Sequence, residues 1–203
     1  MKYIDSNFPN LTSELHLRFE LGKPYENGTE DRFNQVVTRV TTLFEEVFKP
    51  DDSIYIYIKD WEITEDIMFG NTTPEYLYDL LCDQNIEEET LYDIDEDYDE
   101  VTGQTIEVKN EYKVKFVYSQ LKSVPYQKIL EGIGNYEQGR KPSIGQSVYF
   151  ISIDKGLLFH MYDDRGCLIH SKGIEKLLPL YHTYNNWLVD YWREDFDSIF
   201  KKV

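Results

Sequence analysis

The chain has 203 residues, of which 41 % are hydrophobic and 15 % aromatic, a composition that argues against disorder and is sufficient for a core. Its 38 acidic and 21 basic residues give a formal net charge of −17, which argues against direct binding to nucleic acid or to an anionic membrane surface. The N-terminal stretch has no apolar signal region, and no stretch is long enough to span a bilayer. We therefore predict a cytoplasmic protein.

The first half of the chain shows clear hydrophobic periods. Alternation over 15–21 predicts a half-buried strand, and apolar residues at helical spacing over 30–48 predict a helix that ends before Pro50. A second strand is expected at 53–61, with Ile54, Ile56 and Ile58 on one face. A short helix is expected at 74–82, capped by Thr73.

Residues 86–100 hold nine acids and no base. Like charges at this density resist packing, so we predict a mobile loop or hairpin end, an acidic insertion near 86–104 in a single domain of residues 1–203. A calcium loop of the EF-hand type starting at Asp93 fails, because Tyr98 stands where Gly is needed and Gln104 where Glu is needed. A loose divalent-ion site stays open as an alternative to a solvated acidic loop.

Between this segment and the C-terminal third, residues 105–112 and 114–118 are predicted to pair as a hairpin across Asn110. A short helix over 125–133 and a loop over 134–145 follow.

Residues 147–171 predict a meander of three antiparallel strands, with Gly156 and Gly166 as bulge residues that close two turns. This register places Phe150 opposite Phe159, Ser152 opposite Leu157, Tyr162 opposite Cys167, and His160 opposite Ile169. One face then carries Val148, Phe150, Ser152, Leu157, Phe159, Met161, Leu168 and His170, and the other carries Tyr149, Ile151, Leu158, His160, Tyr162, Cys167 and Ile169. Neither face is polar, so both are expected to be covered, by helices or by a partner.

A long helix is predicted to begin at Pro179 and to cover the sheet with an aromatic stripe, with a groove for a partner helix as the alternative. The stripe comprises Leu180, Tyr181, Tyr184, Trp187, Leu188, Tyr191, Trp192, Phe196, Ile199 and Phe200. The expected class is α+β: a mostly antiparallel sheet with a C-terminal three-stranded meander and helices packed on the sheet.

The sequence offers few candidates for chemistry. Cys82 and Cys167 have no metal or redox spacing and are expected to be small buried hydrophobes. The predicted register puts His160 and His170 on opposite faces, which excludes them as a metal pair. There is no nucleophile elbow, phosphate-binding glycine loop or HExxH helix. We predict no catalytic residue, no metal site and no cofactor.

The turn Asp163-Asp164-Arg165-Gly166 has two interpretations: an exposed tip that meets a partner or an anion, or a hairpin turn whose Asp side chain bonds backbone amides. The run 156–167 that contains this turn resembles an uncharacterised bacterial domain-of-unknown-function family of bacilli and their relatives. The segments 17–22, 41–45, 50–52, 140–142, 177–181, 184–187 and 197–200 resemble it too. The resemblance implies no known activity and no catalytic residue, although small acidic proteins of such families often serve as immunity proteins or antitoxins.

We therefore predict a non-catalytic acidic binding protein, such as an immunity protein or antitoxin that neutralises a basic, nuclease-type partner. One alternative is an enzyme with a cleft lined by Tyr55, Tyr57, His160 and Arg165, and another is an inhibitor that mimics nucleic acid. The doubly apolar meander also leaves room for a homodimer. The predicted partner-binding residues are Glu87, Glu88, Glu89, Asp93, Asp95, Glu96, Asp97, Asp99, Glu100, Asp163, Asp164 and Arg165.

Overall fold

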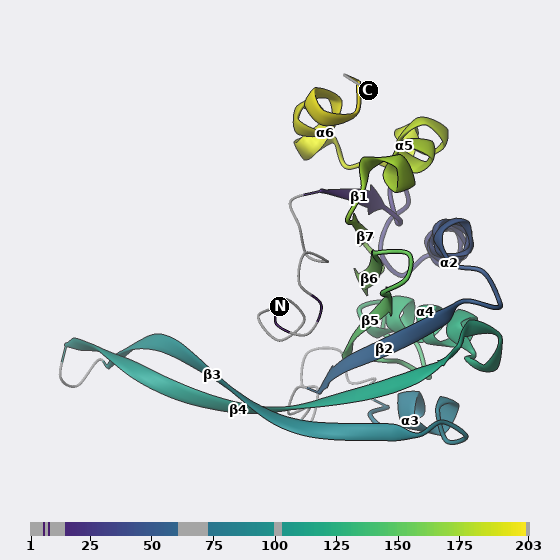
Figure 1. The fold of residues 1–203 in the computed structure, drawn as a ribbon. Helices are drawn as coiled ribbons and strands as arrows, with labels where there is room; N and C mark the ends of the chain where they lie inside the picture. Colours follow the sequence, from purple (N-terminus) through teal and green to yellow (C-terminus); the bar gives the residue numbers. More distant parts are fainter. Residues whose placement is uncertain (1–5, 7, 9–14, 61–72, 100–102, 202–203) are drawn as a thin grey trace.

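The structure is a computed structural model that describes residues 6, 8, 15–60, 73–99 and 103–201. Within these residues one antiparallel sheet has the strand order β1-β7-β6-β5-β2-β4-β3 (Figure 1). The strands are β1 His16–Glu20, β2 Ser53–Asp60, β3 Ile86–Asp99, β4 Gln104–Gln120, β5 Ser147–Ser152, β6 Leu157–Asp163 and β7 Gly166–Ser171. The helices are α2 Glu30–Val47, α3 Tyr76–Leu80, α4 Tyr126–Tyr136, α5 Ile174–Thr183 and α6 Arg193–Phe200, with 3-10 turns at Leu121–Ser123, Asn185–Trp187 and Asp190–Trp192. The predicted α+β class and the meander are confirmed.

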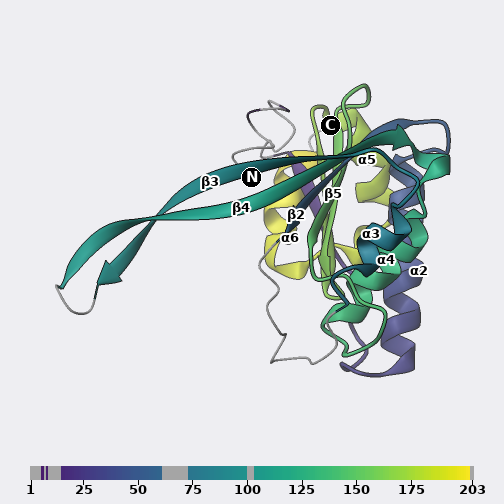
Figure 2. The same cartoon turned by 90° about the horizontal axis from the view of Figure 1, so that it is seen from below.

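The main core lies between the sheet and the helices α2, α3, α4 and α5, which gather on one side (Figure 2). Helix α2 begins as predicted, because the side chain of Thr29 accepts a hydrogen bond from the Arg32 backbone N–H. Its buried stripe includes Phe44, whose ring meets the rings of Phe150 and Phe159 edge-on at 4.8 and 5.1 Å. The helical period of 30–48 therefore identified the element that covers the sheet.

A second, smaller core lies on the opposite face of the sheet. Its buried members are Phe8, Tyr57, Val114, Ile151 and Leu158. Both faces of the central strands are thus covered, as their lack of polar residues predicts. Of the predicted strand 53–61, Trp61 lies outside the described residues. No helix in the described part of the chain combines the length and the apolar composition needed to cross a membrane.

The register of the meander is confirmed at its first turn and wrong at its second. Gly156 has φ 61° and Ser152 lies opposite Leu157, as expected of a bulge glycine. In the second hairpin Gly166 pairs directly with Asp163, and the irregularity falls between Met161 and Asp163. The pairs Tyr162–Cys167 and His160–Ile169 are therefore replaced by Met161–Cys167 and His160–Leu168. This shift of one residue moves Cys167 and Ile169 to the helix-covered face and Leu168 and His170 to the other.

The second turn closes differently because Asp163 supplies the acceptor that the turn needs. Its carboxylate accepts the Arg165 backbone N–H at 2.7 Å, so Gly166 does not take positive φ. Glycine is required at position 166 for another reason. A Cβ there would lie 2.5 Å from the carbonyl oxygen of Phe19 in the neighbouring strand β1.

Replacing Gly166 by Ala is therefore expected to cost about 2 kcal/mol of stability, because the clash is with backbone and relief requires β1 and β7 to separate. Gly156→Ala, where the strain is the positive φ and the nearest atoms belong to the flexible Lys172 side chain, is expected to cost about 1 kcal/mol. Urea denaturation of both variants measures the difference. A Gly166→Ala variant no less stable than Gly156→Ala would contradict the close approach of the two strands.

The predicted long C-terminal helix is wrong. Helix α5 holds Pro179 inside it and ends at Thr183, and α6 starts at Arg193. Between them Leu188 bridges Phe19, and the Val189 N–H donates to the Arg18 carbonyl at 3.1 Å. The edge of β1 that faces away from β7 thus pairs with residues 188–189. Apolar residues in this segment recur at helical spacing, which is why a helix is predicted there. The aromatic stripe is split accordingly: Tyr181, Phe196 and Phe200 are buried, whereas Tyr191 is 91 % exposed.

Smaller expectations also need correction. Thr73 does not cap α3, because its hydroxyl donates to the Ser143 carbonyl at 2.7 Å, and α3 is shorter than 74–82. Cys82 is exposed rather than buried, while Cys167 is buried as predicted. The hairpin across Asn110 is wrong, because β4 is one unbroken strand.

Candidate functional site: an acidic hairpin arm

The acidic segment forms a strand of a long hairpin. β3 pairs with β4 from Ile86–Val117 to Asp99–Gln104, whereas β2 pairs only with residues 113–120 of β4. Residues 91–99 and 103–112 therefore lie beyond the sheet as a two-stranded ribbon, which we call the arm (Figures 1 and 2). Its nine residue pairs span about 30 Å at the usual rise per residue.

Acidic residues occupy alternate positions of β3. Every odd-numbered position from Glu87 to Asp99 is acidic except Leu91, while the even positions are acidic only at Glu88 and Glu96. Alternate positions of a strand share a face, so one face of the hairpin holds most of the acids. The pairing puts Glu87 beside Phe116, Glu89 beside Val114 and Asp97 beside Ile106, with no base among the partners of the odd positions. We call this side, with the exposed Glu87, Glu89, Asp97, Ile106 and Tyr118, the acidic face.

The three lysines of β4 lie beside the even positions, on the other face. Lys113 pairs with Glu88 at 3.1 Å, and Lys115 pairs with Asp60 at 2.7 Å. The ammonium of Lys109 lies 3.7 Å from the centre of the Tyr92 ring. These lysines offset most of the four acids on that face, Glu88, Glu96, Glu107 and Glu111, whereas the β4 partners of the acidic face supply no base.

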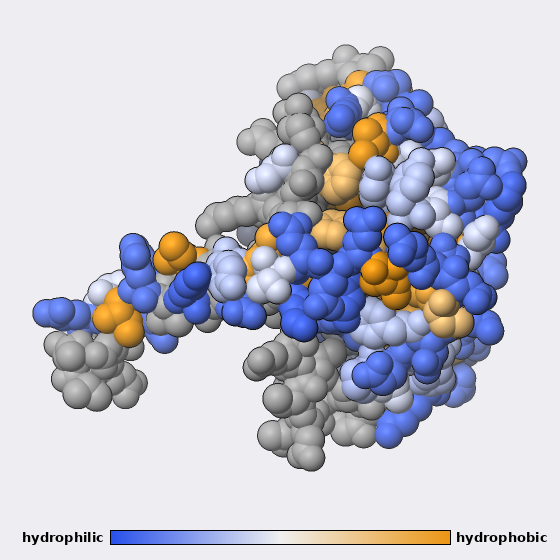
Figure 3. Space-filling model, turned by 60° about the horizontal axis from the view of Figure 1, so that its bottom comes forward, coloured by the Kyte–Doolittle hydropathy of each residue, from blue (hydrophilic) through white to orange (hydrophobic). Residues whose placement is uncertain are grey.

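Apolar side chains lie among the carboxylates. Tyr92, Ile94 and Ile106 of the arm are 53 %, 59 % and 44 % exposed, and Figure 3 shows apolar residues among hydrophilic ones along it. Where the hairpin meets the sheet, a pocket of about 540 Å³ is lined by Phe8, Tyr55, Glu87, Glu88, Glu89, Phe116 and Ile153. Exposed apolar groups rimmed by charges mark interaction sites more often than ordinary surface.

The predicted site residues fall into three groups. Glu87, Glu88, Glu89, Glu96 and Asp97 are exposed along the hairpin. Asp93, Asp95 and Asp99 take their register positions in β3, and Glu100 lies outside the described residues. Asp163 and Asp164 are 5 % and 1 % exposed, so the exposed-tip interpretation is wrong for them, although the Arg165 side chain is 61 % exposed.

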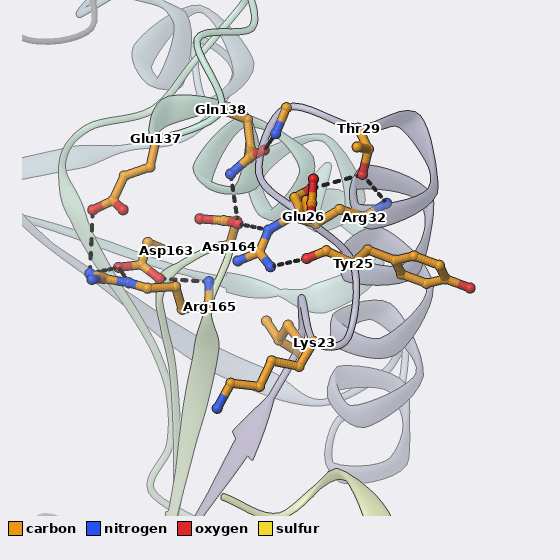
Figure 4. A network of polar contacts seen from close by, with 12 residues as sticks. Lys23, Tyr25, Glu26, Thr29, Arg32, Glu137, Gln138, Asp163, Asp164 and Arg165 are labelled. Atoms are coloured by element: carbon orange, nitrogen blue, oxygen red, sulfur yellow. Dashed lines mark hydrogen bonds and ion pairs between the residues drawn. The ribbon is translucent and has the colours of Figure 1, made fainter.

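Asp163 and Asp164 belong to an internal ion-pair network (Figure 4). Arg32 of α2 donates from Nε to the Asp164 carboxylate at 2.6 Å, and Gln138 donates to the same oxygen at 2.8 Å. Asp163 accepts both the backbone N–H and the guanidinium of Arg165. The turn is therefore structural, as its second interpretation states. Its carboxylates link the meander to α2 and to the residues that follow α4.

A third carboxylate, that of Glu137, completes this network. The carboxylate oxygens of Glu137, Asp163 and Asp164 lie within 4.8 Å of one another. Burial raises the pKa of Glu137, and the nearby Asp163 raises it further. Burial also raises the pKa of Asp164, while Arg32 opposes the rise. Because two guanidinium groups already bind these carboxylates, the trio is an ion-pair network and not a cation site.

Arg32 is not among the residues predicted above, although the sequence carries a signal for it. Arg32 stands four residues before Val36, which itself precedes Val40 by four, so it continues the buried stripe of α2. An arginine on a core-facing stripe requires a buried acid as partner. The spacing of Lys109, Lys113 and Lys115 at odd positions of β4 was likewise the signal for two unlike faces of the hairpin.

The histidines and the predicted enzyme cleft are rearranged by the shifted register. His160 and His170 lie on the same face, contrary to prediction, and the His170 ring centre is 5.1 Å from that of His16. His160 stacks on Tyr149 at 4.0 Å, and burial lowers its pKa to about 3, with His170 adding to the effect. Tyr57 is buried, Tyr55 lines the pocket beside the arm, and His160 and Arg165 line another. The four cleft residues therefore do not share one site.

Comparison with known proteins agrees with the resemblance seen in the sequence. No solved structure matches the chain. Over 69 residues it is 32 % identical to "Uncharacterized protein YnaE" of Bacillus subtilis (strain 168), a match that covers 31 % of this chain and 32 % of that protein. The model of the family described as "Domain of unknown function (DUF3885)" matches residues 1–192. The chain belongs to this DUF3885 family.

Proposed function

We propose that the protein is a non-catalytic binding protein whose acidic face docks on a basic protein partner, in the manner of an immunity protein or antitoxin that neutralises a basic toxin. The observation that supports this best is the separation of charge on the hairpin. The odd positions of β3, which carry most of its acids, share a face with the exposed Ile106 and Tyr118, and the lysines of β4 lie on the other face with the exposed Tyr92 and Ile94.

This separation favours association with a basic surface. A surplus of carboxylates on one face of a projecting ribbon steers a cationic partner and raises the association rate, and salt weakens that effect. Ile106 and Tyr118 add apolar area that desolvates on contact and slows dissociation. The charges thus raise the association rate and orient the partner, and the apolar groups lower the dissociation rate.

The pocket beside the base of the arm suits a Lys or Arg side chain of the partner. The ring centre of Tyr55 lies 5.4 Å from that of Phe8 and 4.7 Å from that of Tyr118, so aromatic rings gather there. Glu87, Glu88 and Glu89 line the same pocket. A cation placed there would meet ring faces and carboxylates together, the environment in which interface hot spots with Arg are found.

The test neutralises three acids on one face at a time. Glu87→Gln/Glu89→Gln/Asp97→Asn removes three charges from the acidic face, and Glu96→Gln/Glu107→Gln/Glu111→Gln removes three from the other face of the same hairpin. Each protein is tagged and used to capture partners from host lysate, and the partner found is then titrated. We expect a basic protein that elutes with salt and binds the first variant at least about tenfold more weakly than wild type, with the second variant near wild type.

Two outcomes would contradict the proposal. Equal weakening by both variants would show that net charge alone attracts the partner. A column that retains no basic protein in stoichiometric amount would remove the basis for an inhibitor of this kind.

Mimicry of nucleic acid is a second candidate, favoured by the regular alternation of acids along β3. Alternate positions of a strand are about 6.7 Å apart, so these positions form a linear array of negative charge. This candidate predicts that duplex DNA competes with the protein for its partner. The first candidate predicts capture that DNA leaves unchanged.

A further inference from the structure

A second pocket, of about 630 Å³, opens among β1, β6, β7 and the loop that leads into α2. It is separate from the acidic arm and takes no residue from β3 or β4. Its lining residues are Arg18, Glu20, Lys23, Asn27, Arg32, His160, Tyr162, Arg165 and Leu168. In a chain with a net charge of −17, this lining holds four cationic side chains and one acid.

Arg18 is held in place with donors to spare. Its Nε donates to the Tyr162 hydroxyl at 3.0 Å, and its guanidinium lies over the rings of Tyr162 and Trp192, 5.0 and 5.2 Å from their centres. Among the described residues its two terminal nitrogens have no hydrogen-bond acceptor. The Tyr162 hydroxyl accepts from Arg18 and so keeps its own proton to donate.

The other cations are similarly oriented by internal acids. Arg165 uses Nε and Nη2 on Asp163 and Nη2 also on Glu137, and Arg32 uses Nε on Asp164 and Nη1 on the Tyr25 carbonyl. In the described structure the remaining terminal nitrogen of each guanidinium has no acceptor. Lys23, whose side chain is 74 % exposed, meets Glu20 at 3.3 Å at the rim.

We propose that this pocket binds a small molecule that carries phosphate groups. Arginine forks match phosphate oxygens in pairs, so the guanidinium nitrogens that the internal acids leave without an acceptor are suited to phosphate oxygens. Arg18, which pairs with no acid in the described structure, adds the positive charge that a phosphate favours. The rings of His160 and Tyr162, with Leu168, offer a less polar wall for the rest of the ligand. The volume lies within the ordinary range for small-molecule sites.

The net charge of the chain does not prevent this binding. At physiological ionic strength, charges on exposed groups are screened beyond about 8 Å, so the acids of the arm act weakly at the pocket. The local groups decide the affinity. The pocket shares no residue with the acidic face, so either proposal could fail without the other.

The test is calorimetric titration of the full chain with sodium pyrophosphate and, separately, with ADP, at constant ionic strength. We compare wild type with Lys23→Gln/Arg165→Gln, and with Lys122→Gln/Lys128→Gln, which removes two charges from exposed lysines outside the pocket. We expect saturable binding to wild type. The affinity should fall about 100-fold in the first variant, which is about tenfold for each lost charged hydrogen bond, and should stay unchanged in the second.

The probes also separate two kinds of ligand. Tighter binding of ADP than of pyrophosphate would assign a nucleotide-like ligand, and equal binding would assign the phosphate groups alone; both support the site. No saturable heat with either probe would overturn the proposal, as would equal weakening in both double variants. If the first double variant fails to fold, Lys23→Gln alone tests the site, because that side chain is largely exposed.

Discussion

Replacing Arg32 by Met is expected to lower the free energy of unfolding by about 3–5 kcal/mol. Arg32 and Asp164 are 6 % and 1 % exposed, and their ion pair spans α2 and the meander. Without the guanidinium, the Asp164 carboxylate stays buried with Gln138 as its one remaining side-chain donor among the described residues. An uncompensated buried charge is among the largest single destabilising changes that a side chain can cause.

A matched control is Arg140→Met. Arg140 pairs with Glu30 at 2.7 Å, but the two side chains are 25 % and 75 % exposed. Solvent screens such a pair, so we expect a loss of about 1 kcal/mol or less. Equilibrium urea unfolding measures both variants. Losses of similar size would show that water reaches the Arg32–Asp164 pair.

The pH dependence of the Arg32→Met variant separates charge from packing. Burial raises the pKa of Asp164 even with Arg32 present, and loss of Arg32 removes the group that opposes that rise. A carboxyl whose pKa is higher in the folded than in the unfolded state destabilises the fold as pH rises through its folded pKa. The deficit relative to wild type should therefore shrink as pH falls from 7 towards 4. A deficit independent of pH would indicate lost packing.

Local patterns predicted the elements that bury a periodic face. The alternation around Leu17 and Phe19 gave β1, and the spacing of Val36, Val40 and Phe44 gave α2, because these side chains meet the core at the period of their own element. The α+β class follows from such elements. The class can be assigned without knowing which strands are neighbours in the sheet.

Contacts between residues far apart in the sequence determined the features that local patterns did not predict. The acid-rich segment became a strand because β4, which follows it, supplies a partner along its whole length. Gly166 met the backbone of Phe19 rather than closing a bulge, and Leu188 bridged the edge of β1 rather than continuing a helix. The Arg32–Asp164 pair joins residues 132 positions apart. The acidic face likewise becomes visible only when β3 and β4 are aligned, because neither strand alone shows that acids and lysines lie on opposite faces of the hairpin.

The second large effect concerns pH and His160. Burial, with His170 close by, lowers the pKa of His160 to about 3, against 6.5 for an unperturbed histidine. A histidine whose folded pKa is depressed is protonated in the unfolded chain first, so stability is lost as pH falls from about 6.5 towards 3. Between pH 7 and pH 5 this group should remove about 2 kcal/mol from the free energy of unfolding.

Replacing His160 by Phe isolates this contribution, because Phe retains a ring to stack on Tyr149 and cannot be protonated. The expected result is that the stability of wild type minus that of His160→Phe falls by about 2 kcal/mol from pH 7 to pH 5. Carboxylates common to both proteins cancel in this difference. A His160→Phe profile parallel to that of wild type would mean that the folded protein takes up the proton as readily as the unfolded chain, and that the ring is open to water.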